Sequence, residues 1–478
     1  MKKIAAVFAA LSICLWPFAQ QNLGIRNSNY AGIQGALLNP ASMAGSPLSL
    51  DVNILSADVV FDNTFLYVPK KKLAVFGFKN IIDGAINETI FYSRYDPQNP
   101  NKLNNVTFSS EILGPSFFVK VAKKHEIGFT ASARMYANIN DIPGNMAENA
   151  YAYFRVRDLW GVQFQDNSTR VNSMGWLEYG LHYAAILYGD RKNELKAGIS
   201  LNYLQGLAAA YAKNTHVSYS IADSANLVFV NSSVDYGRTN FDDFKKFGSH
   251  NLNHGHGFGA DIGFIYTRLK EAGYAGNTRV HIQSAPEKDD YVYRLGISLI
   301  DLGAINFNRN TTSYHLQASQ ADFTNWSHIG FNSNAQVDET LSAVFYNGDS
   351  AKSVTGNHFK MALPAAISLQ ADWDFYKQFF INATIIKGFG HGSQQGVIRP
   401  DVYSLTPRYE TTRFEASVPV SLLYYHHLQP RVGFAIRYSY FFIGGDAPAS
   451  LLKLSPLNGV DFYGGIHYFI PEKRGVRG

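Results

Sequence analysis

Apolar and polar residues alternate with a period of two along much of this chain. Residues 174–188 give the clearest case, where Leu177 and Leu181 fall on one face and Glu178 falls on the other. Successive side chains of a β-strand point to opposite faces, so this pattern predicts a strand. Residues 194–206 repeat the pattern after a short polar turn, which predicts a hairpin with one continuous apolar face.

The same alternation predicts fourteen strands in all. An even number returns the chain to the side from which it started, as an exported barrel requires. The weakest predictions are the first three strands. The expected strands cover residues 49–55, 64–68, 73–79, 111–122, 126–138, 174–188, 194–206, 257–267, 290–304, 359–373, 378–388, 412–425, 431–443 and 458–470.

The predicted connections fall into a short and a long class. Transmembrane barrels have short periplasmic turns and longer extracellular loops, so we expect the short class to be periplasmic. The connection 268–289 does not fit, because it is long for a periplasmic turn. The short connections are Pro69–Lys72, Lys123–His125, Gly189–Asn193, Phe375–Lys377 and His426–Pro430. The long ones cover about residues 80–110, 139–173, 207–256, 306–358, 389–411 and 444–457.

Composition separates a membrane barrel from a soluble sandwich. The 478 residues are 14% aromatic and only 17% charged, whereas soluble domains carry about 25% charge. Beyond residue 18 there is no run of about 18 apolar residues, which argues against membrane-spanning helices. In a soluble sandwich the apolar face would be the core, and alternation alone leaves that alternative open. Aromatic residues near the strand ends favour an all-β, transmembrane, antiparallel up-and-down β-barrel.

The N-terminus predicts export. Lys2 and Lys3 precede an apolar stretch that ends at Phe18, which is typical of a secretory signal peptide, here residues 1–19. Cys14 lies inside this stretch, and a lipoprotein alternative is weakened by Ile13, where a small residue is needed. Without Cys14 the mature chain has no cysteine, so disulfides and thiolate chemistry are not expected.

Residues 20–48 are glycine-rich, lack strand periodicity and contain Asn39, Pro40 and Ala41. With the predicted barrel, this segment resembles the long-chain fatty-acid transporter (FadL) superfamily, in which an Asn-Pro-Ala motif belongs to an N-terminal hatch. The stretches 296–303 and 363–369 resemble a Bacteroidota branch that includes uncharacterised outer-membrane barrels and the shuttle barrel of type IX secretion. The resemblance implies a plug at 20–48, a barrel at 49–470 and a short tail at 471–478. The alternative is an ordinary leader turn into the first strand.

The motif itself has a physical reading. A residue before proline is held extended, and the Asn39 amide can bond nearby backbone groups as in an Asx-turn. Such a turn would satisfy backbone groups of a plug that has no strand partners.

Charged residues on the polar strand faces are the main candidate site. They would be costly against lipid, so we expect them to face the lumen. There they either fill the pore as a paired network or line a substrate path. The lumen-facing candidates are Arg134, Glu178, Lys196, Asp261 and Arg294.

Other chemistry is thinly supported. His250, His254 and His256 could bind a metal, but no carboxylate is adjacent, and a polar loop is the simpler interpretation. No spacing singles out a catalytic triad or a phosphate cradle, and the net charge of +5 does not indicate nucleic-acid binding. We therefore expect no enzyme, cofactor or metal site.

The predicted function is that of an outer-membrane barrel, in contact with outer-membrane lipids. It would act in passive transport of a hydrophobic small molecule or as a component of an outer-membrane assembly. The alternative is a structural or secretion-accessory barrel that docks outer-membrane protein partners through its long extracellular loops.

Overall fold

The structure is a computed structural model that describes residues 22–72, 91–240, 252–270, 291–324, 334–346, 349–376, 378–390, 395–426, 428–446 and 456–472. The predicted signal peptide, the strand expected at 73–79 and most of the C-terminal tail lie outside these residues. Within them, no helix is both long enough and apolar enough to span a membrane.

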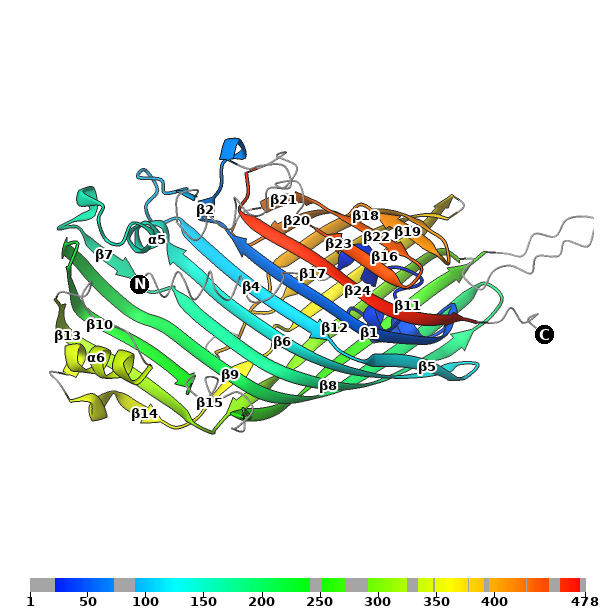
Figure 1. Ribbon diagram of the computed structural model, residues 1–478, viewed down its shortest axis with the longest axis horizontal. Coiled ribbons are helices and arrows are strands. Elements are labelled where there is room, and N and C mark those ends of the chain that lie inside the picture. The colour runs from blue at the N-terminus through cyan, green and yellow to red at the C-terminus, as the bar shows by residue number, and fades with distance from the viewer. Residues whose placement is uncertain are drawn as a thin grey trace, which may run out of the picture.

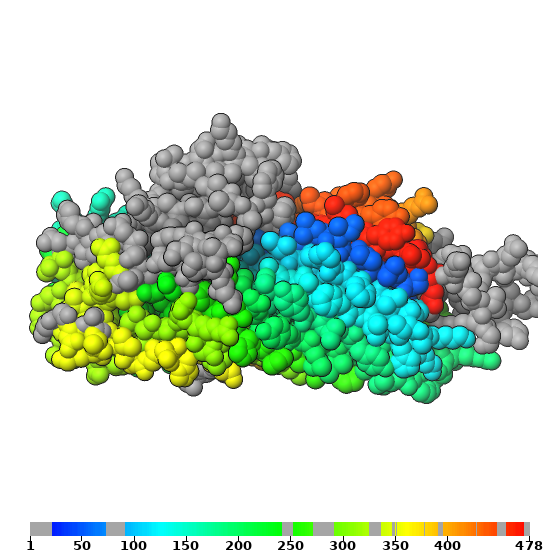
Figure 2. All heavy atoms as spheres, turned by 60° about the horizontal axis from the view of Figure 1, so that its bottom comes forward, coloured from blue at the N-terminus to red at the C-terminus, as the bar shows by residue number. Residues whose placement is uncertain are grey.

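The chain folds into a closed antiparallel barrel of fourteen strands, as the alternation predicted. Closure is direct, because β1 pairs with β24 on one side and with β4 and β5 on the other. Figure 2 shows β24, in red, beside β1, in blue. Around the wall the strands are β1 (Leu48–Asn63), β4 (Leu103–Leu113) continued by β5 (Ser116–Ala122), β6 (His125–Pro143), β8 (Arg170–Gly189), β9 (Asn193–Asp223), β11 (Gly255–Leu269), β12 (Tyr291–Phe307), β15 (Phe359–Ala362) continued by β16 (Ala366–Tyr376), β17 (Phe379–Gly388), β18 (Asp401–Glu410), β19 (Phe414–Ser417) continued by β20 (Val420–Tyr424), β21 (Leu428–Val432) continued by β22 (Phe434–Tyr438), β23 (Phe441–Gly445) and β24 (Gly459–Pro471).

Three of the interrupted wall strands break at proline. Pro115 separates β4 from β5, Pro364 separates β15 from β16, and Pro419 separates β19 from β20. Proline has no N–H to donate to a sheet ladder, so pairing stops locally while the strand direction continues.

The wall is much taller on one side. Beyond Gly206, β9 leaves β11 and pairs with β10 (Asn226–Thr239) and β7 (Gln163–Asp166). We call the sheet formed by β7, β10, β13 and residues 207–223 of β9 the extension; it is seen at the left of Figure 1. The remaining elements include β13 (Thr311–Phe323) paired with β10, β14 (Val354–Gly356) paired with β13, α6 (Asn334–Tyr346) packed on β13, α5 (Gly144–Tyr151), and the separate pair β2 (Leu66–Tyr67) and β3 (Tyr92–Ser93).

The barrel wall is apolar outside, and its inward face is polar over much of its height. Leu181, Leu201 and Phe258 point outward and are 66%, 59% and 71% exposed, whereas the inward Ser200 and Asn202 are buried. This inverts a soluble protein, in which burying apolar area supplies the driving force for folding. The apolar belt stops at Tyr203 and Phe258. In the described part of the extension, residues 207–223 of β9, β10 and β13 carry no large exposed apolar side chain.

Most short turns lie at one end of the barrel, where the two ends of the barrel chain also meet. The Glu472 N–H donates to the Pro47 carbonyl at 2.8 Å, and the turns at 123–124, 190–192, 411–413 and 439–440 lie at this same end. The predicted turn His426–Pro430 lies at the opposite end, which corrects our placement of it. The reason is that residues 401–410, predicted as loop, form β18 and thereby reverse the direction of the later strands.

The set of fourteen strands also differs from the predicted set. Of residues 64–68, only Leu66 and Tyr67 are strand, and they lie outside the barrel wall. Residues 431–443, predicted as one strand, form parts of β21, β22 and β23, with a reversal at Ser439, whose φ is 53°. The expected loops 207–256 and 306–358 contain long strands of the extension. Their patterns were missed because apolar residues are sparse in them. In β13, for example, the residues between the buried Leu316 and Phe323 are Gln, Ala, Ser, Gln, Ala and Asp, which leaves little period-two signal.

Candidate functional site: the barrel interior

Residues 22–47 lie inside the ring of strands as three short helical turns (Figure 1). These are α2 (Leu23–Arg26), α3 (Ile33–Ala36) and η1 (Pro40–Met43). Contacts run from α2 to β18, β19 and β22, from α3 to β1 and β5, and from η1 to β8, β9 and β11. The segment therefore touches the inner wall around most of its circumference.

Asn39 organises the turn into η1. Its backbone is extended, with φ −151° and ψ 108°, and its Oδ1 accepts from the Ala41 N–H at 3.0 Å. Its Nδ2 lies 2.9 Å from Gln370 Oε1, on the wall, and 3.3 Å from the Phe264 carbonyl oxygen. One amide thus caps the turn and ties it to two strands. Pro40 follows at the first position of the turn, where a missing N–H costs nothing.

Wall glycines make room for this segment. A β-carbon on Gly198 would lie within 3.0 Å of Pro40, and one on Gly263 within 3.0 Å of Asn39. Both positions face inward on neighbouring strands. Only glycine lets the backbone approach this closely, so these positions fit the wall to the turn.

Two further anchors hold the segment by carboxylates. The Ser28 hydroxyl lies 3.0 Å from Glu410 Oε1 and 2.9 Å from Glu415 Oε2. On the other side, the Ile33 N–H donates to Asp51 Oδ1 at 2.9 Å. His467 Nδ1 lies 2.8 Å from Asp51 Oδ2. Polar bonds, together with an apolar contact cluster around Ile33, Met43 and Phe118, hold the segment in place.

A charged network crosses the middle of the lumen. Arg134 donates to Glu178 at 3.0 Å and to both oxygens of Asp301, at 2.6 and 3.0 Å. Asp301 also pairs with Arg399. All four side chains are less than one tenth exposed. Buried charges are tolerated only when paired in this way.

Of the other three predicted lumen residues, one joins this network and two lie elsewhere in the interior. Asp261 joins the network, since its Oδ1 accepts from the Asp301 N–H at 2.7 Å. Arg294 belongs to a separate cluster and lies 2.8 Å from Asp372. Lys196 is also buried and lies 3.7 Å from Glu194. The structure thus brings three of the five candidates together and leaves Arg294 and Lys196 apart.

Sequence reasoning missed the residues that complete these clusters. Asp301 and Arg399 close the central network, and Asp51, Glu410 and Glu415 hold the N-terminal segment. Asp301 follows a regular alternation but sits at φ 55°, in the left-handed region, so its facing could not be read from the period. One signal in the sequence was the pair of inward glycines on adjacent strands, Gly198 and Gly263, which mark where the N-terminal segment comes close to the wall.

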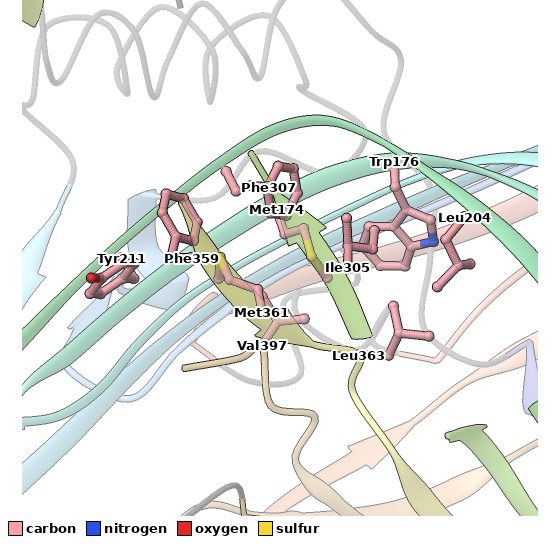
Figure 3. Close-up of a cluster of buried hydrophobic side chains, with 11 residues drawn as sticks. Met174, Trp176, Leu204, Tyr211, Ile305, Phe307, Phe359, Met361, Leu363 and Val397 are labelled. Carbon is pink, nitrogen blue, oxygen red and sulfur yellow. The ribbon is translucent and has the colours of Figure 1, made fainter. Parts of the chain in front are cut away.

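On the side of the network nearer the extension, which we call the upper side, the lumen wall is apolar. Figure 3 shows this upper cluster, in which Met174, Trp176 and Leu204 face Ile305, Phe307 and Met361. Trp176 links the two layers, because its Nε1 donates to Glu178 at 2.9 Å and its ring lies 5.0 Å from the Arg134 guanidinium. The full upper cluster is Met174, Trp176, Leu204, Ala209, Tyr211, Ile305, Phe307, Phe359, Met361, Leu363 and Val397.

A polar cavity of about 80 Å³ lies beside the N-terminal segment. Arg26, Asn39, Lys196, Arg294 and Asp372 are among its lining residues. It is large enough for a few water molecules, and its charged lining suits water better than an apolar molecule.

The histidine cluster does not assemble as a metal site among the described residues. His254 is buried with Nδ1 2.5 Å from the Leu207 carbonyl oxygen, His256 is exposed, and His250 lies outside the described residues. Across the described part of the chain, no group of three or more metal-ligating side chains is found.

A pair of a histidine and a carboxylate lies in the extension, outside the apolar belt. His315 Nδ1 lies 2.6 Å from Asp235 Oδ1, between β13 and β10. The hydrogen bond to Asp235 raises the pKa of His315 above its usual value, although partial burial opposes the rise.

The sequence matches a protein-family model described as "Family of unknown function (DUF5723)" over residues 43–446. The chain belongs to this family. No curated protein matches it in sequence.

Among solved structures, similar ones include the deltaS2 mutant of the monoaromatic hydrocarbon channel TodX, at 10% identity and TM-score 0.40, covering 92% of this chain and 93% of that one. A FadL homologue of Pseudomonas aeruginosa has 10% identity and TM-score 0.39, with 95% and 98% covered. The toluene transporter TbuX of Ralstonia pickettii has 10% identity and TM-score 0.38, with 96% and 99% covered.

Proposed function

We propose that this protein is an outer-membrane barrel that admits small hydrophobic molecules, with residues 20–48 as its plug. The outward apolar belt supports a position in a lipid bilayer, because an exposed apolar ring of this extent is stable only against lipid. The short turns and both ends of the barrel chain would face the periplasm, and the extension would face outward. Residues 1–19 would direct export.

The observation that carries the proposal is the upper cluster. Water-filled barrels have polar interiors, but here the inward side chains above the charged network are Met, Trp, Leu, Ile and Phe. Ligand sites for hydrophobic molecules are lined by such side chains with a few polar groups beside them. The network of Arg134, Glu178 and Asp301 supplies those polar groups, and the plug below it closes the route.

An uptake assay tests this function. The protein is expressed in cells whose outer membrane slows an apolar naphthylamine dye that fluoresces on reaching inner lipid. We expect faster dye entry than in cells without the barrel. Met361→Gln, which makes the upper cluster polar, should slow entry, while Ser319→Gln on the exposed face of β13 should not. Dye entry unchanged by the barrel itself would refute the proposal.

A second candidate is a structural or secretion-accessory barrel with protein partners. The observation that favours it is the extension, in which β9, β10 and β13 rise beyond the apolar belt with α6 packed against β13. The stretches 296–303 and 363–369 also support this candidate, because they resemble a Bacteroidota branch that includes the type IX shuttle barrel as well as uncharacterised barrels. Purification from the native membrane with quantitative mass spectrometry tests it, since stoichiometric partners that depend on residues 207–239 are expected only for this candidate.

A further inference from the structure

Residues 395–400, the last part of the connection from β17 to β18, fold into the barrel instead of rising away from it. Gly396 forms a parallel β-bridge with Ala362, and the Val397 N–H donates to the Ala362 carbonyl at 3.2 Å. The Ile398 N–H donates to Asn138 Oδ1, on β6, at 2.9 Å. Around the wall, five strands separate β6 from β17: β8, β9, β11, β12 and β16. The segment therefore crosses the lumen.

Val397 inserts its side chain into the upper cluster. It is fully buried there together with Met174, Trp176, Met361 and Leu363, and Figure 3 shows it next to Met361. Every other member of the cluster belongs to, or directly follows, a wall strand. Val397 is the exception, because it reaches the cluster on a connecting segment.

Arg399, two residues later, fixes the segment to the charged network. Its guanidinium pairs with Asp301, and its Nε donates to the Pro364 carbonyl at 2.8 Å. Asp301 is shared with Arg134, which also stacks on Trp176. The apolar contact of Val397 and the ion pair of Arg399 are thus joined through Arg134 and Trp176.

We propose that residues 395–400 are an internal stopper and that Val397 occupies the binding site of a small, uncharged, apolar molecule. Ligand and Val397 compete for the same surface, so binding requires the segment to leave the cluster and the Arg399–Asp301 pair to break. Met174 and Met361 suit such an exchange, because unbranched thioether side chains repack around different shapes. This inference rests on the proposed function and names its site.

The bridge between Ala362 and Gly396 permits a direct test. Paired chains lie about 4.8 Å apart, within the range that a disulfide spans. Cys14 is the only cysteine in the sequence, so Ala362→Cys with Gly396→Cys creates a single pair. Trp176 serves as the reporter, with the other tryptophans replaced by phenylalanine and bromobenzene as an apolar quencher. The same protein, oxidised and reduced, is its own matched control.

We expect bromobenzene to quench Trp176 in the reduced protein and not in the oxidised one. Equal quenching in both states, or quenching in neither, would overturn the stopper. A second variant avoids the crosslink. Arg399→Gln removes the ion pair, so the state in which residues 395–400 have left the upper cluster becomes more populated. The bromobenzene concentration for half-quenching of Trp176 should therefore fall by about tenfold. Arg309→Gln, at an exposed position, should leave it unchanged. An unchanged value for Arg399→Gln would also count against the proposal.

The dye-entry assay separates this inference from the proposed function. If oxidation protects Trp176 but the barrel does not speed dye entry, the stopper stands and the transport function fails. If dye entry is fast and equal in oxidised and reduced protein, transport stands and the stopper fails.

Discussion

Gly198 on β9 lies directly against Pro40 of η1, so close that a β-carbon on Gly198 would lie within 3.0 Å of the Pro40 backbone. Backbone atoms cannot move aside as the tip of a flexible side chain can. The position of the N-terminal segment therefore depends on the absence of a side chain at one wall residue.

Gly198→Ala should displace η1 from the wall. Overpacking a tight contact costs about 1–3 kcal/mol, which is enough to populate a state with the segment partly undocked. We expect larger and more frequent conductance events in planar bilayers than for the unaltered protein. Gly356→Ala is the control, because a β-carbon there has open space around it. Identical conductance for the two variants would show that η1 does not restrict the lumen.

Asn39→Ala should loosen the same segment without adding bulk. The change removes the cap on Ala41 and takes the Asn39 donor away from Gln370 Oε1, which lies 2.9 Å from it. Losing such buried bonds costs about 1–3 kcal/mol. Amide hydrogen exchange of residues 22–47 should accelerate while that of the wall strands stays slow. Asn306→Ala, at an exposed position of β12, is the matched control. Equal protection in both variants would mean that Asn39 is not an anchor.

The barrel was predictable because its signal is local. Period-two alternation along 174–188 or 194–206 depends only on which face meets lipid, and the belt residue Leu201 obeys it. The number of strands agreed with the structure through compensating errors. β18 and the division of 431–443 between two wall strands were missed, while residues 64–68 and the expected strand 73–79, which is not one of the fourteen, were counted. In β18 Pro407 stands between the inward residues Thr406 and Arg408, and proline is uncommon inside a strand because it has no N–H for the sheet ladder.

The interior was less predictable because it depends on contacts between distant parts of the chain. Arg134 and Glu178 were expected in the lumen from their facing alone. Their partner Asp301 lies 167 residues from Arg134, and Arg399 comes from a connection. Neither partner carries a local pattern, so no period could have paired them.

Leu201→Arg should destabilise the barrel through the lipid face. Leu201 is 59% exposed within the apolar belt, two residues before the belt ends at Tyr203. An arginine on the lipid face costs up to about 2–4 kcal/mol at the bilayer midplane and less toward the interface. The folded fraction in lipid vesicles, measured by heat-modifiable migration during urea titration, should fall accordingly. Ser319→Arg, on the exposed face of β13, should have little effect because that face meets water. A similar loss for both variants would contradict the assignment of the belt to lipid.

The pair of His315 and Asp235 should make the extension sensitive to pH. The hydrogen bond from Asp235 raises the pKa of His315 above its usual value in the folded state, so folding favours the protonated form. The stabilisation is therefore complete below the unfolded pKa and is lost as the pH rises through the raised folded pKa. Local opening of β10 and β13, from hydrogen exchange corrected for its intrinsic pH dependence, should increase across that window.

Asp235→Asn supplies the matched control for this pair. The amide removes the negative charge and weakens the bond to the protonated ring, so the pKa of His315 should fall and local opening should lose most of its pH dependence. Titration of the His315 ring by NMR measures the pKa directly in both proteins. A His315 pKa that is equal in the two proteins, or an extension that becomes more stable as the pH rises, would show that the pair does not act as a proton-linked contact.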